Sequence, residues 1–151
     1  MCVFQPPYPK GGTSEAALSC LQWMQGQLDV LQPGEQDLIV LPEYANVPGL
    51  NDAATLQVFA EDVGREFVAY VADVSARLSC LIAMGGVAKT GVGWQNQVMV
   101  FEAQKTPIYL YNKVHLTNVE SQQLQLVPGN EVGVFDWQGI RFGFAVCFDM
   151  Y

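Results

Sequence analysis

Three polar residues of this chain have complementary chemistry and similar positions. Glu43, Lys113 and Cys147 each follow a segment whose apolar pattern predicts a strand. Ligands of α/β sheets bind beyond the ends of strands, so such residues can meet at one site. A thiol, a carboxylate and an ammonium are the groups needed to form a nucleophile, remove its proton and stabilise an oxyanion. Their combination predicts a cysteine-dependent catalytic site.

Each of these residues also has a simpler interpretation when it is taken alone. A Glu after Leu-Pro is commonly a loop residue, a single Lys a surface charge, and a Cys in an apolar strand a small buried side chain. His115 suggests a different hydrolase, in which an imidazole activates Cys147. In an extended segment His115 and Lys113 would point to the same side. We interpret His115 instead as a residue that forms hydrogen bonds within its loop.

Phosphate-binding and metal-binding patterns are incomplete in this sequence. Residues 85–91 (GGVAKTG) suggest a phosphate loop, but Ala83 and Ala88 occupy the required glycine positions. We therefore predict a glycine-rich hairpin turn there. The chain has one His and four Cys, without a Cys-x-x-Cys pair. We expect neither a metal nor another cofactor.

The composition is that of a packed domain with an acidic surface. The chain has 151 residues, half of them hydrophobic, and a net charge of −8. Carboxylates in excess repel phosphate backbones and anionic head groups, so neither a nucleic acid nor a membrane is an expected partner. The cysteines are widely spaced, and the first residues do not form a signal peptide. These features predict a cytoplasmic protein with reduced thiols.

The apolar periodicity predicts a mixed α/β, or α+β, sandwich. Helical spacing predicts two helices, at 15–31 with Thr13 or Ser14 as its cap, and at 53–78. Short apolar or alternating runs predict strands at 3–5, 37–41, 80–84, 96–102, 107–111, 132–137 and 140–146. The pairs 96–102 with 107–111, and 132–137 with 140–146, are predicted hairpins, the second one turning at Gln138-Gly139.

Four short motifs in order resemble those of the carbon-nitrogen hydrolase family, also called the nitrilase superfamily. They are residues 37–43 (DLIVLPE), 111–116 (YNKVHL), Glu120 with 127–129 (VPG), and 146–149 (VCFD). The resemblance covers essentially the whole chain. It places the Glu, Lys and Cys of the family's catalytic triad on Glu43, Lys113 and Cys147, and a second glutamate on Glu120.

The resemblance implies a four-layer α-β-β-α sandwich and hydrolysis of a small amide or carbamoyl compound through a Cys147 thioester. Glu43 would be the general base and Lys113 the oxyanion stabiliser, with Glu120 orienting either Lys113 or the substrate. Tyr44 and Phe148 are candidate substrate contacts, although both are equally well explained as packing aromatics. A nitrilase and a catalytically silent binding relative are the alternatives.

The last residues predict a chain that is only part of its domain. Residues 141–151 form an apolar segment without a closing helix or a polar tail. The motif of the family normally continues beyond this point. We therefore expect residues 1–151 to be the N-terminal part of a single carbon-nitrogen hydrolase domain, which would form a homo-oligomer when complete. We expect this part to be inactive on its own.

Overall fold

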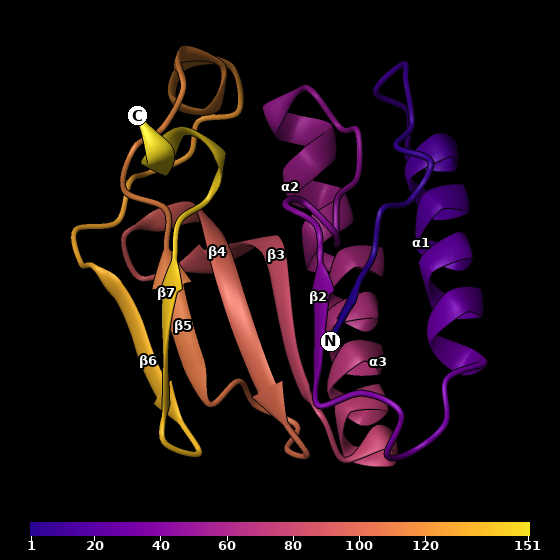
Figure 1. Cartoon of the computed structure of the whole chain (residues 1–151). Coiled ribbons are helices and arrows are strands. Elements are labelled where there is room, and N and C mark those ends of the chain that lie inside the picture. Colours follow the sequence, from indigo (N-terminus) through magenta and orange to yellow (C-terminus); the bar gives the residue numbers. More distant parts are fainter.

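The computed structural model describes residues 1–151, which form a five-stranded sheet, three helices and a separate β-hairpin (Figure 1). In chain order the elements are β1 (Cys2–Val3), α1 (Ser14–Asp29), β2 (Leu38–Leu41), α2 (Ala53–Glu61), α3 (Val63–Leu78), β3 (Leu81–Thr90), β4 (Gly93–Glu102), β5 (Tyr109–Asn112), β6 (Gly133–Trp137) and β7 (Ile140–Phe144). Two short helical turns lie at Val119–Gln123 and Cys147–Met150.

The strands of the main sheet follow one another in the order β1-β2-β3-β4-β5. Helical connections make β1, β2 and β3 parallel, because a crossover returns the chain to the same end of the sheet. Short connections make β3, β4 and β5 antiparallel. The hairpin of β6 and β7 forms a second sheet. Its turn has positive φ angles at both Gln138 and Gly139, as a type I′ hairpin requires.

The main sheet is covered on both faces, which explains its long apolar runs. Alternate residues of β3 point to opposite sides: Ile82 and Met84 join the core under the helices, whereas Leu81 and Ala83 face the hairpin. Tyr109 of β5 connects the two sheets, because its ring lies 5.2 Å from that of Phe135 and 5.7 Å from that of Phe144, measured between centroids. The resulting order is helices, sheet, sheet.

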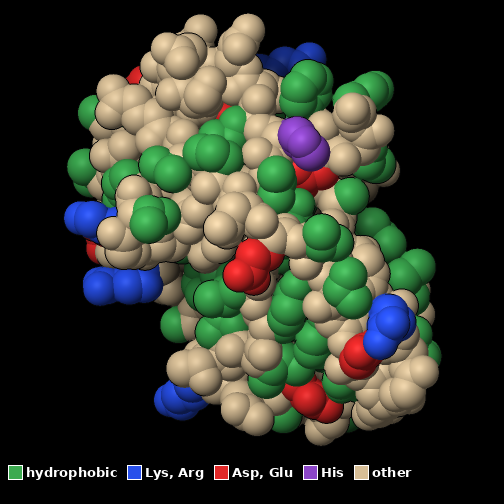
Figure 2. All heavy atoms as spheres, turned by 90° about the vertical axis from the view of Figure 1, so that its left-hand side faces the viewer, with side chains coloured by type: hydrophobic (Ala, Val, Ile, Leu, Met, Phe, Trp, Pro, Cys, Tyr) green, Lys and Arg blue, Asp and Glu red, His purple; other side chains and the backbone are tan.

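This arrangement agrees with the expected mixed α/β fold and with three layers of the predicted sandwich (Figure 1). Seen from the hairpin side, hydrophobic side chains are spread between a few charged groups, and one basic and one acidic side chain lie in contact (Figure 2). Val134 of β6 and Ile140 of β7 are among the exposed apolar residues. No helix of the chain is both long and apolar enough to cross a bilayer.

The helix predicted over 53–78 is wrong in its continuity, because the structure has two helices there. Asp62, with φ −111° and ψ −98°, leaves the helical region and ends α2. The apolar spacing continues across this break, so periodicity alone cannot detect it. The first helix agrees better with its prediction, since the Thr13 hydroxyl caps it by accepting from the Ala16 N–H at 3.3 Å.

The glycine-rich turn predicted at 85–91 is also wrong in position. Gly85 and Gly86 lie inside β3, and the turn to β4 falls at residues 91–92. A Cβ on Gly85 would stand 2.7 Å from the Cα of Glu43, and one on Gly86 would stand 2.8 Å from Oδ1 of Asn46. These glycines therefore let the segment after β2 pack against β3, which positions Glu43.

Candidate active site

The residues that the sequence singled out meet at one end of the sheet. Glu43 follows β2, Lys113 follows β5, and Cys147 comes shortly after β7. The carboxyl ends of these three strands are drawn uppermost in Figure 1. Together with Glu120 and Tyr44, these three residues line a cavity of about 440 Å³. Glu43 and Cys147 also line an apolar cavity of about 420 Å³ between the two sheets. The sequence-predicted thiol, ammonium and carboxylates thus share one space.

Lys113 is a buried cation held between two carboxylates. Its side chain is 1% exposed, and its Nζ lies 2.9 Å from Glu43 Oε1, 2.9 Å from Glu120 Oε1 and 3.0 Å from Glu120 Oε2. Burial lowers the pKa of Lys113, but its hydrogen bonds to the carboxylates outweigh burial and raise the pKa above its usual value. Lys113 is therefore a fixed positive charge beside the cavity.

Asn96 of β4 is a site residue that the sequence analysis missed. Its Nδ2 donates to Glu43 Oε1 at 2.7 Å and to Glu120 Oε1 at 2.9 Å, so one amide group bridges both carboxylates. Its Oδ1 is buried without a hydrogen-bond partner. A polar side chain at the start of an apolar strand was the only local signal for Asn96. Asn96 and Lys113 together hold Glu43 and Glu120 in place.

Glu120 is nearly enclosed by hydrogen-bond donors. Besides Lys113 and Asn96, it accepts from the Tyr44 hydroxyl at 2.7 Å and from the Thr117 N–H at 2.8 Å. Burial raises the pKa of Glu120, but the donors, Lys113 first, together lower it to about 2. Burial and the bond to Glu120 raise the pKa of Tyr44, so its hydroxyl remains a donor. Glu120 therefore stays ionised and orients Lys113.

This pKa shift predicts a loss of stability in acid. The pKa of Glu120 is about 2 in the folded chain, below its ordinary value of 4.5, so the stabilisation is fully present above pH 4.5 and is lost as the pH falls through 2. The loss is on the order of 3 kcal/mol. We expect Glu120→Gln to remove this part of the pH dependence. Denaturant unfolding of the wild type and of Glu120→Gln, from neutral pH to pH 2, measures this difference. The prediction is contradicted if the free energy of unfolding has the same pH dependence in the two proteins.

Cys147 occupies a strained position at the start of the final helical turn. It was predicted to end the last strand, but β7 ends at Phe144, and Cys147 is the first residue of the turn Cys147–Met150. Its φ of +48° is unusual for a residue other than glycine and costs on the order of 1 kcal/mol. This conformation leaves Cys147 exposed at the mouth of the cavity.

Of the other candidates from the sequence, one lines this cavity and two do not. Tyr44, also with a positive φ of 58°, lines it. Phe148 is not among the lining residues, and its ring centroid lies 5.7 Å from that of Tyr151. His115 is exposed and does not line the cavity either, and its Nδ1 lies 3.5 Å from Asp149 Oδ1. No group of three or more His, Cys, Asp or Glu side chains is arranged to hold a metal ion.

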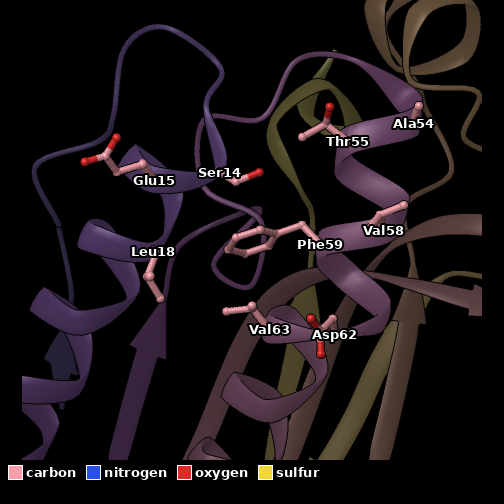
Figure 3. Close-up of a pocket in the computed structure, with 9 residues that line it drawn as sticks. All are labelled: Ser14, Glu15, Leu18, Ala54, Thr55, Val58, Phe59, Asp62 and Val63. Carbon is pink, nitrogen blue, oxygen red and sulfur yellow. The ribbon is translucent and has the colours of Figure 1, made fainter.

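A larger cavity, of about 660 Å³, lies between the start of α1 and the length of α2, and it reaches the first residue of α3 (Figure 3). The Phe59 ring points into the space between the two helices, whereas the Glu15 carboxylate points away from it (Figure 3). Neither a thiol nor a lysine lines this cavity. The groups that could make and stabilise a covalent intermediate are therefore at the other cavity, around Lys113.

Comparison with known proteins assigns the chain to a family. The sequence pattern of the carbon-nitrogen hydrolase family matches residues 13–151. The chain therefore belongs to the carbon-nitrogen hydrolase family, as its motifs suggested. A 2-oxoglutaramate amidase from Bacillus subtilis is 26% identical over 115 residues, which are 76% of this chain and 44% of that protein.

Solved structures show the same fold. A carbon-nitrogen hydrolase superfamily protein from Xanthomonas campestris, with an arsenic adduct in its active site, matches 95% of this chain and 51% of its own length, with a TM-score of 0.73 and 23% identity. An amidase from Nesterenkonia sp. matches 97% of this chain and 54% of its own length, with a TM-score of 0.74 and 16% identity. The chain thus spans about half the length of the relatives it matches.

Proposed function

We propose that this chain supplies the catalytic residues of a hydrolase that cleaves the carbon-nitrogen bond of a small linear amide or carbamoyl compound through a thioester on Cys147. One observation carries the proposal: the buried ammonium of Lys113 lies 2.9 Å from the Glu43 carboxylate, and both line a cavity with Cys147. A general base, an oxyanion stabiliser and a nucleophile are thus available at one place.

In the acylation step, Glu43 accepts the thiol proton of Cys147 and the sulfur attacks the amide carbon. Lys113, together with the Phe148 N–H, stabilises the oxyanion that develops on the amide oxygen. The tetrahedral intermediate then collapses with loss of the amine or ammonia, which takes its proton from Glu43. The products of this step are the free amine and a thioester on Cys147.

In the deacylation step, Glu43 acts again as the base. It takes a proton from a water molecule, which attacks the thioester carbon, and the acid leaves as the Cys147 sulfur regains its proton. Glu120, with a pKa of about 2, remains a carboxylate throughout and keeps Lys113 in place. One carboxylate moves protons, and the other holds the cation.

The relatives support amide chemistry. The match from Bacillus subtilis is named a 2-oxoglutaramate amidase. A variant of the Nesterenkonia amidase carries the acetamide moiety of fluoroacetamide covalently at its active-site cysteine. These properties belong to those proteins, and we extend only the reaction type to this chain.

Ammonia release from small linear amides and from the corresponding nitriles tests the proposal. In the complete protein we expect turnover of amides, a thioester that mass spectrometry finds on the peptide containing Cys147, and loss of both in Cys147→Ala. Cys20→Ala changes a buried cysteine that does not line the cavity, and it serves as the control. Turnover of nitriles alone would favour a nitrilase, and turnover retained by Cys147→Ala would refute the proposal.

A further inference from the structure

Asp149 is a buried carboxylate that the proposed reaction does not use. Its side chain is 5% exposed, and its two oxygens accept four hydrogen bonds. Oδ1 accepts from the N–H groups of Val114, at 3.2 Å, and His115, at 2.8 Å. Oδ2 accepts from the Val146 N–H, at 3.0 Å, and from the Tyr111 hydroxyl, at 2.8 Å. Hydrogen bonds to an ionised carboxylate are stronger than those to a neutral acceptor, so these four donors hold Asp149 firmly in one orientation.

The partners of Asp149 come from the two segments that carry the nucleophile and the cation. Val114 directly follows Lys113, and Val146 directly precedes Cys147. The Asp149 N–H also donates to the Val146 carbonyl at 3.0 Å, which closes the turn around Cys147. One carboxylate therefore connects the strained turn of Cys147 to the backbone beside Lys113.

We infer that Asp149 is a positioning residue that holds the Cys147 sulfur in register with the Lys113 ammonium. This inference rests on the proposed function of Cys147 as the nucleophile. The turn has a left-handed residue at Cys147, so it needs local hydrogen bonds to keep this conformation. The Asp149 carboxylate supplies one within the turn, from the Val146 N–H, and also accepts from the backbone that follows Lys113. Asp149 does not touch the reacting atoms and acts through the two segments that it joins.

The state of Asp149 fits this role. Burial raises its pKa, but hydrogen bonds from the His115 and Val146 N–H groups and from Tyr111 outweigh burial and lower the pKa below its usual value. Burial and the bond to Asp149 raise the pKa of Tyr111 to about 12. At neutral pH Asp149 is therefore an acceptor only and Tyr111 a donor.

Asp149→Asn is the informative substitution, because it preserves shape but replaces one acceptor oxygen by an NH₂ group. If this group faced Val114 and His115 it would meet two N–H donors. We expect the NH₂ group to face Tyr111, because the Tyr111 hydroxyl can turn and accept from it. The Val146 N–H, which bonds to the same oxygen in the wild type, would then face the NH₂ group and lose its acceptor. The variant should therefore loosen the turn of Cys147 and leave the rest of the fold intact.

Alkylation by iodoacetamide, followed for each cysteine by mass spectrometry, tests this inference in the intact chain. In the wild type we expect Cys147 to react faster than Cys2. In Asp149→Asn the rate at Cys147 should fall by about tenfold, and its pH profile should move to higher pH. The buried Cys20 and Cys80 should remain protected in both proteins. Asp136→Asn, a change of an exposed carboxylate on β6, should leave the rate at Cys147 unchanged.

The possible outcomes separate the inference from the function on which it rests. An unchanged rate and pH profile at Cys147 in Asp149→Asn, with a selectively reactive wild type, overturns the positioning role alone. A wild type whose Cys147 is no more reactive than Cys2 overturns the proposed function and this inference with it. If Asp149→Asn unfolds, Cys20 and Cys80 become reactive. In that case Tyr111→Phe, which removes one of the four hydrogen bonds to Asp149, decides. We expect the alkylation rate at Cys147 to fall by about threefold in Tyr111→Phe, and an unchanged rate overturns the inference.

Discussion

Replacing Lys113 by Met should cause the largest loss of both stability and activity. The side chain of Lys113 is 1% exposed, and its ammonium separates the carboxylates of Glu43 and Glu120. Its removal leaves two negative charges facing each other in a buried site, which costs about 3–5 kcal/mol of folding free energy. If Lys113 also stabilises the oxyanion, kcat for ammonia release should fall by a factor of about 100 to 1000.

The control for this substitution is Lys89→Met. Lys89 pairs with Glu61 on the surface, where both side chains are more than half exposed, so its loss should cost at most about 1 kcal/mol. The double variant with Lys113→Met and Glu120→Gln should recover part of the lost stability, because it removes one of the two facing carboxylate charges. It should not recover the activity. If Lys113→Met and Lys89→Met had the same unfolding free energy and the same rate of ammonia release, Lys113 would have no special part in stability or activity.

The sequence could single out Glu43, Lys113 and Cys147 as candidates because each follows a predicted strand and belongs to a short local motif. Ligands of layered α/β folds bind beyond strand ends, so these residues could be expected to meet before their contacts were known. Glu120 came from the order of the motifs alone. The structure adds the bonds that join Lys113 to both carboxylates.

Asn96 and Asp149 could not be assigned from the sequence for a physical reason. Asn96 bonds to residues 53 and 24 positions away, and three of the four bonds to the Asp149 carboxylate come from residues 34 to 38 positions away, so these bonds leave no local pattern. Only the bond from the Val146 N–H is local. The break of the second helix at Asp62 was hidden in a similar way, because apolar spacing continues from α2 into α3. Periodicity reports which face is buried, and not where the backbone turns.

Gly85→Ala should damage both stability and activity although it alters no polar group of the site. An added Cβ would stand 2.7 Å from the Cα of Glu43 and 2.8 Å from the Pro42 carbonyl oxygen, closer than real Cβ contacts. Both atoms are backbone, so neither can rotate away as a flexible side chain could. We expect the segment after β2 to move away from β3, at a cost of about 1–3 kcal/mol in folding free energy.

This displacement acts on the reaction because Glu43 is joined to Lys113 and Asn96 by bonds of 2.9 and 2.7 Å. A shift of the Glu43 carboxylate by about 1 Å should lower kcat for ammonia release by about 100-fold. Gly91→Ala is the matched control, since a Cβ there meets no atom within 4 Å and Gly91 has no positive φ. It should leave thermal stability and turnover unchanged. If Gly85→Ala behaves like Gly91→Ala, the close approach of β3 does not position Glu43, and Glu43 is held by its side-chain bonds alone.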